Sequence, residues 1–287
     1  MTIDKNIQLV ECPRDAMQGW KHFIPTELKV EYINTLLQVG FHTIDFGSFV
    51  SPKAIPQMAD TNEVLKRLQY GNSGSALLSI VANLRGAEAA VSYDEISYLG
   101  FPFSLSPTFQ LRNTNSTMEE SVKRVEEIQD LCVSHNKKLV VYLSMGFGNP
   151  YGDAYTGEVL LLWADEMVKR GITILSLADT VGLATPGQIS FALNTLIPKY
   201  PGTTIGVHLH STPFNWKEKL EAAVNAGCHR IDGALKGIGG CPMAQDDLIG
   251  NMNTEWIIDY LQQQGLINDI NEAALEKCLA MASRIFS

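Results

Sequence analysis

The stretch 203-TTIGVHLH-210, with the segments that follow it, decides the fold. Thr204–Leu209 is a mostly apolar run with β-branched residues, which predicts a buried strand. A helix-like segment, Trp216–Ala226, comes next, and a second strand-like run, His229–Ala234, follows it. A strand, a helix and a strand in this order predict two parallel strands joined by a helical crossover.

The same alternation extends over the rest of the chain. The other strand-like runs are Ile7–Cys12, His42–Phe46, Ala76–Val81, Glu95–Leu99, Lys138–Leu143 and Thr173–Leu177. The other helix-like segments are Thr26–Gln38, Asn62–Gln69, Met118–Ser134, Glu158–Lys169, Pro186–Leu196, Thr254–Gln264 and Glu272–Ile285. Eight strands in 287 residues predict an α/β protein with one closed (β/α)8 TIM barrel over residues 1–287 and an additional C-terminal helix.

The rival architecture is an open doubly wound sheet, which usually carries a glycine-rich phosphate loop after its first strand. Here that position reads Cys12-Pro13-Arg14-Asp15-Ala16, which is charged and contains no glycine. The first loop therefore favours the barrel.

Composition excludes several classes of partner. The net charge of -9 argues against nucleic acid, which requires clustered Lys and Arg. No apolar run is long enough to span a membrane, and the first residues resemble neither a signal nor a transit peptide. The five cysteines are widely spaced without a CxxC pattern, which favours a reducing compartment. We therefore expect a cytoplasmic protein that binds a small molecule, with neither nucleic acid nor membrane as a partner.

A barrel of this kind places its chemistry at the C-terminal ends of its strands. Polar residues follow several of the predicted strands: Arg14, Asp15, Asp45, Ser48, Asn83, Asp179, Thr180, His208 and His210. One polar strand end would mean little. Several that converge on one mouth favour a functional site.

His208 and His210 lie on the same face of a strand, because successive side chains alternate. An isolated HxH is more often a pair of exposed histidines in a turn. Together with Asp15 as a carboxylate and Asn251 as an amide, however, the pair forms a mixed nitrogen and oxygen set suited to Mg²⁺ or Mn²⁺, with Zn²⁺ as the alternative. Locally, Asp15 also fits a turn after Pro13, and Asn251 fits a helix cap equally well.

Two more side chains near the predicted mouth have alternative roles. Arg14 either pairs with Asp15 or polarises a substrate carbonyl. Cys241, in the sequence Gly-Gly-Cys-Pro, either shuttles a proton or fills space as a small apolar residue. The glycines before it resemble an anion cradle, but only weakly, since no Lys or Arg stands in the right places.

The segments 48-SFVSPK-53 and 239-GGCP-242 are the most distinctive of the chain. The others are Pro13-Arg14-Asp15 with Gln18, 56-PQMAD-60, 83-NLRG-86, 179-DTVG-182, 185-TPG-187, His208-Leu209-His210, Ala244-Gln245 and Gly250-Asn251. In these segments the chain resembles the 3-hydroxy-3-methylglutaryl-CoA lyase family of the DRE-TIM metallolyase superfamily.

The resemblance implies a metal-dependent carbon–carbon lyase that splits 3-hydroxy-3-methylglutaryl-CoA into acetyl-CoA and acetoacetate. It implies Asp15, His208, His210 and Asn251 as ligands of a divalent cation. It also implies Arg14 as the group that stabilises enolate charge and Cys241 as an acid–base residue on a closing loop. His208 or Asp15 is the expected base. We place Asp45 with the catalytic residues, Ser48, Asn83 and Thr180 with the substrate-binding residues, and expect a homodimer as the possible assembly.

Several positions depart from the family pattern. Cys12 and Ala16 replace glycines, Asp45 replaces a Glu, and Ser211 replaces an Asp. Pro213–Trp216 differs as well, and the stretch before Asn251 is one residue longer and carries Asp246 and Asp247. The alternatives are therefore a related acyl-CoA or 2-oxo acid lyase or Claisen-condensing enzyme with the same metal site, and a non-catalytic relative.

Overall fold

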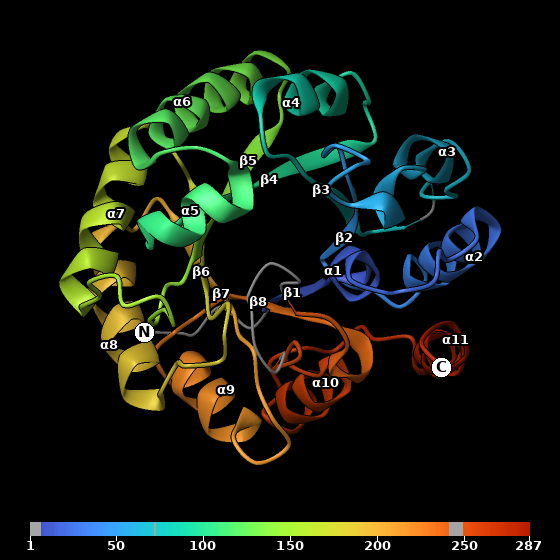
Figure 1. Ribbon diagram of the computed structural model, residues 1–287. Coiled ribbons are helices and arrows are strands. Elements are labelled where there is room, and N and C mark those ends of the chain that lie inside the picture. The colour runs from blue at the N-terminus through green and yellow to red at the C-terminus, as the bar shows by residue number, and fades with distance from the viewer. Residues whose placement is uncertain (1–6, 72, 241–248) are drawn as a thin grey trace.

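The strands close into a parallel barrel in chain order, β1 to β8, which confirms the predicted (β/α)8 architecture (Figure 1). The computed structural model describes residues 7–71, 73–240 and 249–287. Its strands are β1 Gln8–Glu11, β2 Thr43–Ser48, β3 Ala76–Ile80, β4 Ile96–Ser104, β5 Lys138–Ser144, β6 Ile174–Ala178, β7 Thr204–His208 and β8 Arg230–Gly233. The first and last strands pair from Gln8 with Arg230 to Glu11 with Gly233, which closes the sheet.

Helices surround the barrel and pack their apolar faces against it (Figure 1). The long helices are α2 Thr26–Leu36, α6 Met118–Ser134, α7 Gly157–Lys169, α8 Pro186–Lys199, α9 Trp216–Asn225, α10 Thr254–Gln263 and α11 Glu272–Ile285. The shorter ones are α1 Pro13–Gln18, α3 Thr61–Leu65, α4 Leu84–Val91 and α5 Pro107–Thr114, with 3-10 turns η1 Pro56–Met58 and η2 Leu235–Gly237.

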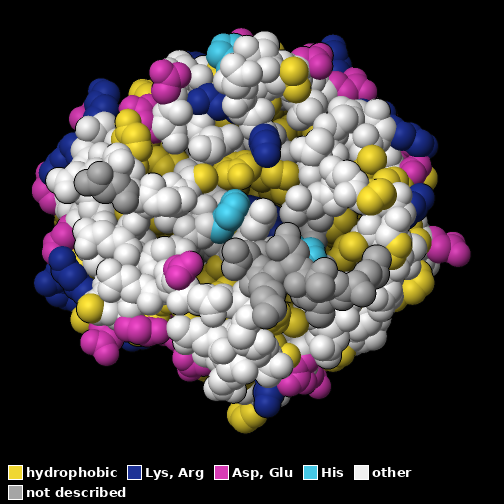
Figure 2. Space-filling model, turned by 180° about the vertical axis from the view of Figure 1, so that it is seen from behind, with side chains coloured by type: hydrophobic (Ala, Val, Ile, Leu, Met, Phe, Trp, Pro, Cys, Tyr) yellow, Lys and Arg dark blue, Asp and Glu magenta, His cyan; other side chains and the backbone are white. Residues whose placement is uncertain are grey.

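Charge is distributed as expected for a ring of helices around a barrel. Seen from behind, most Lys, Arg, Asp and Glu side chains lie around the circumference and few lie near the centre (Figure 2). The predicted C-terminal helix is α11, which packs against α2. Among the described residues, no helix combines the length and the apolar character needed to cross a membrane.

Five elements differ from the sequence-based expectation. Strand β4 continues to Ser104 instead of ending at Leu99, and it pairs with β5 from Tyr98 to Ser104. Gly100 and Pro102 usually end a strand, but the register of the barrel overrides that preference. The helix expected over Asn62–Gln69 is only α3, Thr61–Leu65. The short helices α1, α4 and α5 were not predicted, because each is too short to show a helical period.

The inside of the barrel holds a small apolar cluster. It consists of Leu78, Val140, Tyr142 and Ile174, with Ile80 and Tyr98 packed against it. These residues occupy alternate positions of their strands and so share one face. The larger core lies between the outer faces of the strands and the helices.

Candidate functional site

The predicted site residues gather at the C-terminal ends of the strands. Arg14 and Asp15 lie in α1, directly after β1, because Pro13 starts a helix at its first position. Thr180 follows β6, and His208 ends β7. These residues line one cavity of about 500 Å³, together with Asp45, Ser48, Asn83 and His210. Cys241 lies outside the described residues.

Asp15, His208 and His210 form a group that can hold a metal ion. One ligand atom from each residue lies within 4.8 Å of the others. Asn251 joins them because residues 250–252 run beside the end of β7, where Met252 N donates to Leu209 O and His210 forms an antiparallel bridge with Asn251. Residues far apart in the sequence therefore meet at one point.

The atoms of these side chains that lack hydrogen-bond partners are suited to bind a cation. Asn251 donates its Nδ2 hydrogens to Asp15 Oδ2 at 2.7 Å and to Ile238 O at 2.9 Å. Its Oδ1 atom and the Nδ1 atom of His210 are buried and have no hydrogen-bond partner among the described residues. Two imidazoles, a carboxylate and an amide oxygen make a donor set that Mg²⁺, Mn²⁺ or Zn²⁺ accepts.

The helix-cap alternative for Asn251 is resolved by its neighbour. Asn253 precedes α10, and its side chain accepts a hydrogen bond from Trp256 N at 3.2 Å. Asn253 is therefore the cap, and Asn251 is free to face Asp15. Gly239 makes room for this arrangement, since a Cβ there would lie 2.5 Å from Asn251 Nδ2 and 3.0 Å from Asp15 O.

Arg14 is held by three acceptors beside the proposed cation site. Its Nε and Nη2 atoms donate to Asp45, with Nη2 at 2.5 Å from Oδ2. Its Nη1 atom donates to Asp15 Oδ1 at 3.0 Å and to Gln18 Oε1 at 2.8 Å. These contacts use one hydrogen of Nε, two of Nη1 and one of Nη2, which leaves one Nη2 hydrogen of the guanidinium's five for another acceptor.

The charges of the site shift the pKa values of its acids and bases. Burial alone would raise the pKa of Asp15, but Arg14, His208 and Asn251 hold it below its ordinary value. Burial raises the pKa of Asp45 to about 6, even though Arg14 opposes the rise. Burial and the neighbouring His208 lower the pKa of His210 to about 3, so His210 is a neutral imidazole, the form that binds a metal.

The three proposed substrate-binding residues have different local roles. Ser48 Oγ is buried without a hydrogen-bond partner among the described residues, so it is available to a ligand. Thr180 Oγ1 accepts from Met145 N at 2.8 Å. Asn83 caps α4 by accepting from Gly86 N at 2.9 Å. Thr180 and Asn83 therefore stabilise the backbone of the cavity wall as well as lining the cavity.

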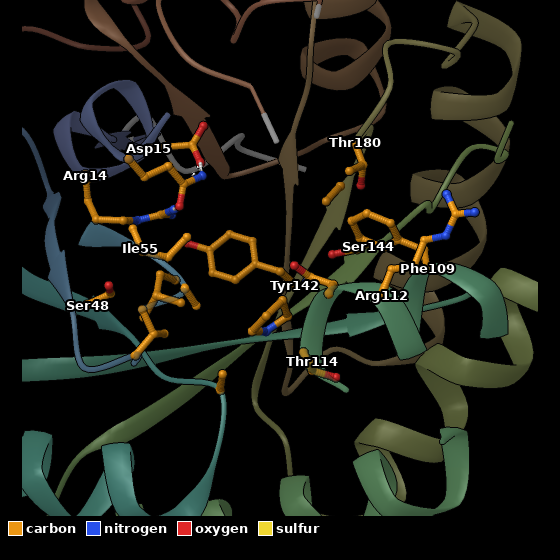
Figure 3. Close-up of a pocket in the computed structure, with 18 of the residues that line it drawn as sticks. Arg14, Asp15, Ser48, Ile55, Phe109, Arg112, Thr114, Tyr142, Ser144 and Thr180 are labelled. Carbon is orange, nitrogen blue, oxygen red and sulfur yellow. Dashed lines mark hydrogen bonds and ion pairs between the residues drawn. The ribbon is translucent and has the colours of Figure 1, made fainter. Parts of the chain in front are cut away.

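The far wall of the cavity comes from residues that the sequence analysis did not identify. Phe109, Arg112 and Thr114 of α5 lie across the cavity from Arg14 and Asp15, with Tyr142 of β5 between the two sides (Figure 3). The guanidinium of Arg112 lies 4.6 Å from the centre of the Tyr151 ring. If β4 had been predicted to end at Ser104, α5 would have been expected in the cavity wall. The segment that follows the C-terminal end of a barrel strand lies at the mouth of the barrel.

Comparisons with known proteins identify the family of the chain and agree with its fold. A family model described as HMGL-like matches residues 6–281. The cytoplasmic 3-hydroxy-3-methylglutaryl-CoA lyase of Homo sapiens is 34% identical over 269 residues, which cover 92% of this chain and 71% of that protein. The mitochondrial hydroxymethylglutaryl-CoA lyase of Macaca fascicularis is 33% identical over 273 residues, which cover 94% of this chain and 82% of that protein.

A solved structure supports the same family and fold. The HMG-CoA lyase of Acinetobacter baumannii, in complex with coenzyme A and 3-methylmalate, superposes with a TM-score of 0.91 at 28% identity. The match covers 100% of this chain and 93% of that one. The resemblance found in the sequence motifs is therefore confirmed.

Proposed function

Because the chain belongs to the HMGL-like family, we propose that it is a carbon–carbon lyase that cleaves 3-hydroxy-3-methylglutaryl-CoA into acetyl-CoA and acetoacetate. The observation that carries the proposal is the meeting of Asp15, His208 and His210 beside Arg14 at the mouth of the barrel. A cation site next to a guanidinium suits a reaction that ionises an alcohol and places charge on a thioester oxygen.

Asp15, His208, His210 and Asn251 would hold the cation, with Mg²⁺ or Mn²⁺ as the proposed ion. When bound, the ion lowers the pKa of the substrate's tertiary hydroxyl and orients it. Asp15 or His208 takes the hydroxyl proton as the base. Retro-Claisen cleavage then leaves an enolate of the thioester, whose oxygen accepts a hydrogen bond from the remaining Nη2–H of Arg14. Cys241 is the proposed proton donor to the enolate carbon.

The cavity also supports an acyl-CoA as the class of substrate. Beyond the charged side, its lining includes the apolar side chains of Val50, Ile55, Ile80 and Phe109. Such a surface suits a thioester and its pantetheine arm. The related lyase from Acinetobacter baumannii, whose solved structure contains coenzyme A, offers independent support for this class.

A cleavage assay tests the proposal. Purified protein receives 3-hydroxy-3-methylglutaryl-CoA with Mg²⁺ or Mn²⁺, then with EDTA, and acetoacetate is measured. We expect product that requires the ion and that is lost in His210→Ala. His135→Ala is the matched control, because that histidine is exposed at the end of α6. The absence of metal-dependent product would refute the proposed substrate.

A panel of other acyl-CoA esters and 2-oxo acids belongs in the same assay. Asp45 is one methylene shorter than the Glu expected from the family pattern, and it binds Arg14 directly. A shorter acid in contact with the guanidinium is a specific reason to include related substrates. If the protein cleaves one of these compounds preferentially, that compound replaces the proposed substrate, and the proposed lyase mechanism stands.

Location and assembly are further parts of the proposal. Four cysteines among the described residues are buried and free, which supports a reducing compartment such as the cytoplasm. Leu162 and Phe191 expose large apolar side chains on the neighbouring helices α7 and α8, which supports a homodimer. Cell fractionation tests the location, and sedimentation equilibrium tests the assembly.

A further inference from the structure

A buried ion pair lies inside the barrel, next to His208, and has no role in the chemistry described above. It consists of Arg230 and Asp232 of β8, whose side chains are 1% and 0% exposed. Within the sheet, Arg230 pairs with Gly206 and Asp232 pairs with His208. Alternate residues of a strand share a face, so Arg230, Asp232 and His208 all point into the barrel.

The chain makes space for this arginine. A Cβ at position 206 would lie 2.9 Å from Arg230 Cβ and from Arg230 O, so only glycine fits opposite Arg230. An arginine inside a barrel is costly unless it is paired. Asp232 is its nearest carboxylate, with Nε and Oδ1 3.8 Å apart.

The Asp232 carboxylate lies between the guanidinium and the imidazole. Its Oδ1 atom faces Arg230, and its Oδ2 atom lies 3.4 Å from His208 Nδ1. Both contacts are ion pairs, because neither oxygen has a hydrogen-bond partner among the described residues, and His208 Nδ1 has none there either. The edge of the His208 ring meets Tyr142 at a centroid distance of 6.0 Å and an angle of 89°, which limits rotation of the imidazole.

We infer that Asp232 is a positioning residue for the cation site: held by Arg230, it keeps the proton of His208 on Nδ1 and so leaves Nε2 free to bind the ion. A carboxylate that accepts from the second nitrogen of a metal-binding histidine fixes both its tautomer and its orientation. The inference rests on the cation site of the proposed function.

A rival interpretation uses the same residues as ligands. One ligand atom each from Cys12, His208 and Asp232 also lies within 4.8 Å of the others, so the three can in principle hold a second, softer cation such as Zn²⁺. The positive charge of Arg230 beside Asp232 disfavours a cation there. The positioning role is therefore the one we propose, and the second site becomes an outcome of the test.

Two substitutions at Asp232 separate positioning from simple packing. Arginine can only donate hydrogen bonds, so in Asp232→Asn the amide oxygen should stay toward Arg230 and the NH₂ group should face His208 Nδ1. That donor forces the histidine proton onto Nε2 and blocks the ion. In Asp232→Ala neither tautomer is imposed. We expect Mn²⁺ affinity to fall about 10–100-fold in Asp232→Ala and further in Asp232→Asn.

The decisive readout is which of the two variants, Asp232→Ala or Asp232→Asn, binds Mn²⁺ more weakly. A packing role predicts the opposite order, because alanine leaves a cavity and an unpaired arginine. Mn²⁺ binding is measured by the loss of the free-ion electron paramagnetic resonance signal, with no acyl-CoA present, on variants whose thermal melts show a folded state. Glu11→Gln is the matched control, since Glu11 is equally buried on the adjacent strand β1, and its Mn²⁺ affinity should equal that of the wild type.

A measurement on the wild-type protein tests the inference without relying on the folding of any variant. Nitrogen-15 chemical shifts of His208 in the ion-free wild type, recorded at a pH where the imidazole is neutral, should show the proton on Nδ1. A neutral imidazole with its proton on Nε2, or wild-type Mn²⁺ affinity in Asp232→Asn, would overturn the inference. So would a thiolate-to-cobalt absorption band with Co²⁺ that disappears in Cys12→Ser, because the three residues would then be ligands. None of these measurements uses substrate, so failure of the cleavage assay leaves their result intact.

Discussion

Two buried ion pairs at the mouth of the barrel differ in how completely their cations are hydrogen-bonded. Lys219 of α9 donates to Asp179 Oδ2 at 2.8 Å, to His210 O at 2.8 Å and to Gly182 O at 3.1 Å. Its three ammonium hydrogens are therefore all used. Arg14 keeps one hydrogen unused and lines the cavity. The first pair holds the rim together, and the second keeps a donor for a ligand.

Two asparagines show the same contrast. Asn253 Oδ1 accepts from Trp256 N and so caps α10. Asn251 Oδ1 is buried without a hydrogen-bond partner among the described residues. A buried polar atom that lacks a partner is costly, so a fold retains it chiefly where something else binds it. Hydrogen-bond satisfaction thus distinguishes Asn253, whose oxygen caps a helix, from Asn251, whose oxygen is open to the proposed cation.

The largest expected effect is on stability, in Lys219→Met. Removal of this ammonium leaves Asp179 as an unpaired buried carboxylate and two carbonyls without donors, which should lower the free energy of unfolding by about 3–5 kcal/mol. Urea unfolding measures the change. Lys217→Met is the control and should change stability by less than about 0.5 kcal/mol, because Lys217 is exposed. A loss below about 1 kcal/mol in Lys219→Met would contradict the structural role.

The next effect is on catalysis, in Arg14→Lys. Lysine keeps the charge but cannot bind Asp45 through two nitrogens and still present a donor to the enolate oxygen. We expect kcat to fall by about 10²–10³-fold, the usual cost of one lost oxyanion donor. Steady-state acetoacetate production measures it. A wild-type kcat in Arg14→Lys would erase the contrast between the two pairs.

Glu11 is a buried acid without a cationic partner, so it differs from both ion pairs in how the stability of the protein should depend on pH. Burial raises the pKa of Glu11 to about 8 from 4.5, although it accepts hydrogen bonds from Thr254 Oγ1 and Leu235 N. Between these values the folded state keeps a proton that the unfolded state has lost. Stability should therefore fall as pH rises through this window, by at most about 1.4 kcal/mol per pH unit. Denaturant unfolding should show a flatter pH dependence in Glu11→Gln, and an unchanged slope would refute the assignment.

The smallest effect concerns the two asparagines. Asn253→Ala should cost about 1 kcal/mol of stability through loss of the cap and leave Mn²⁺ affinity unchanged. Asn251→Ala should weaken Mn²⁺ binding instead. Urea unfolding and Mn²⁺ titration of both variants give the comparison. Similar Mn²⁺ affinities in the two variants would remove Asn251 from the ligand set.

Local sequence was sufficient for the barrel and for much of the charged side of the cavity. Alternating strand and helix patterns are short-range, and the C-terminal end of each strand is a place that can be read from the pattern itself. His208 and His210 could be predicted as a pair for that reason. The far wall was not predicted, because Gly100 and Pro102 obscured the end of β4 and α5 is too short to show a period.

The sequence by itself determined the class of fold, the mouth at which the chemistry lies and the family resemblance, since all three depend on local patterns and contiguous motifs. Only the tertiary structure decided which of two asparagines is a cap, that Arg14 retains a donor while Lys219 does not, and that Arg230 and Asp232 lie behind His208. Asn251 with Asp15, Arg14 with Asp45 and Lys219 with Asp179 are partners that lie tens to hundreds of residues apart in the chain. The count of partners around a buried atom is set by packing in three dimensions, and no local pattern encodes it.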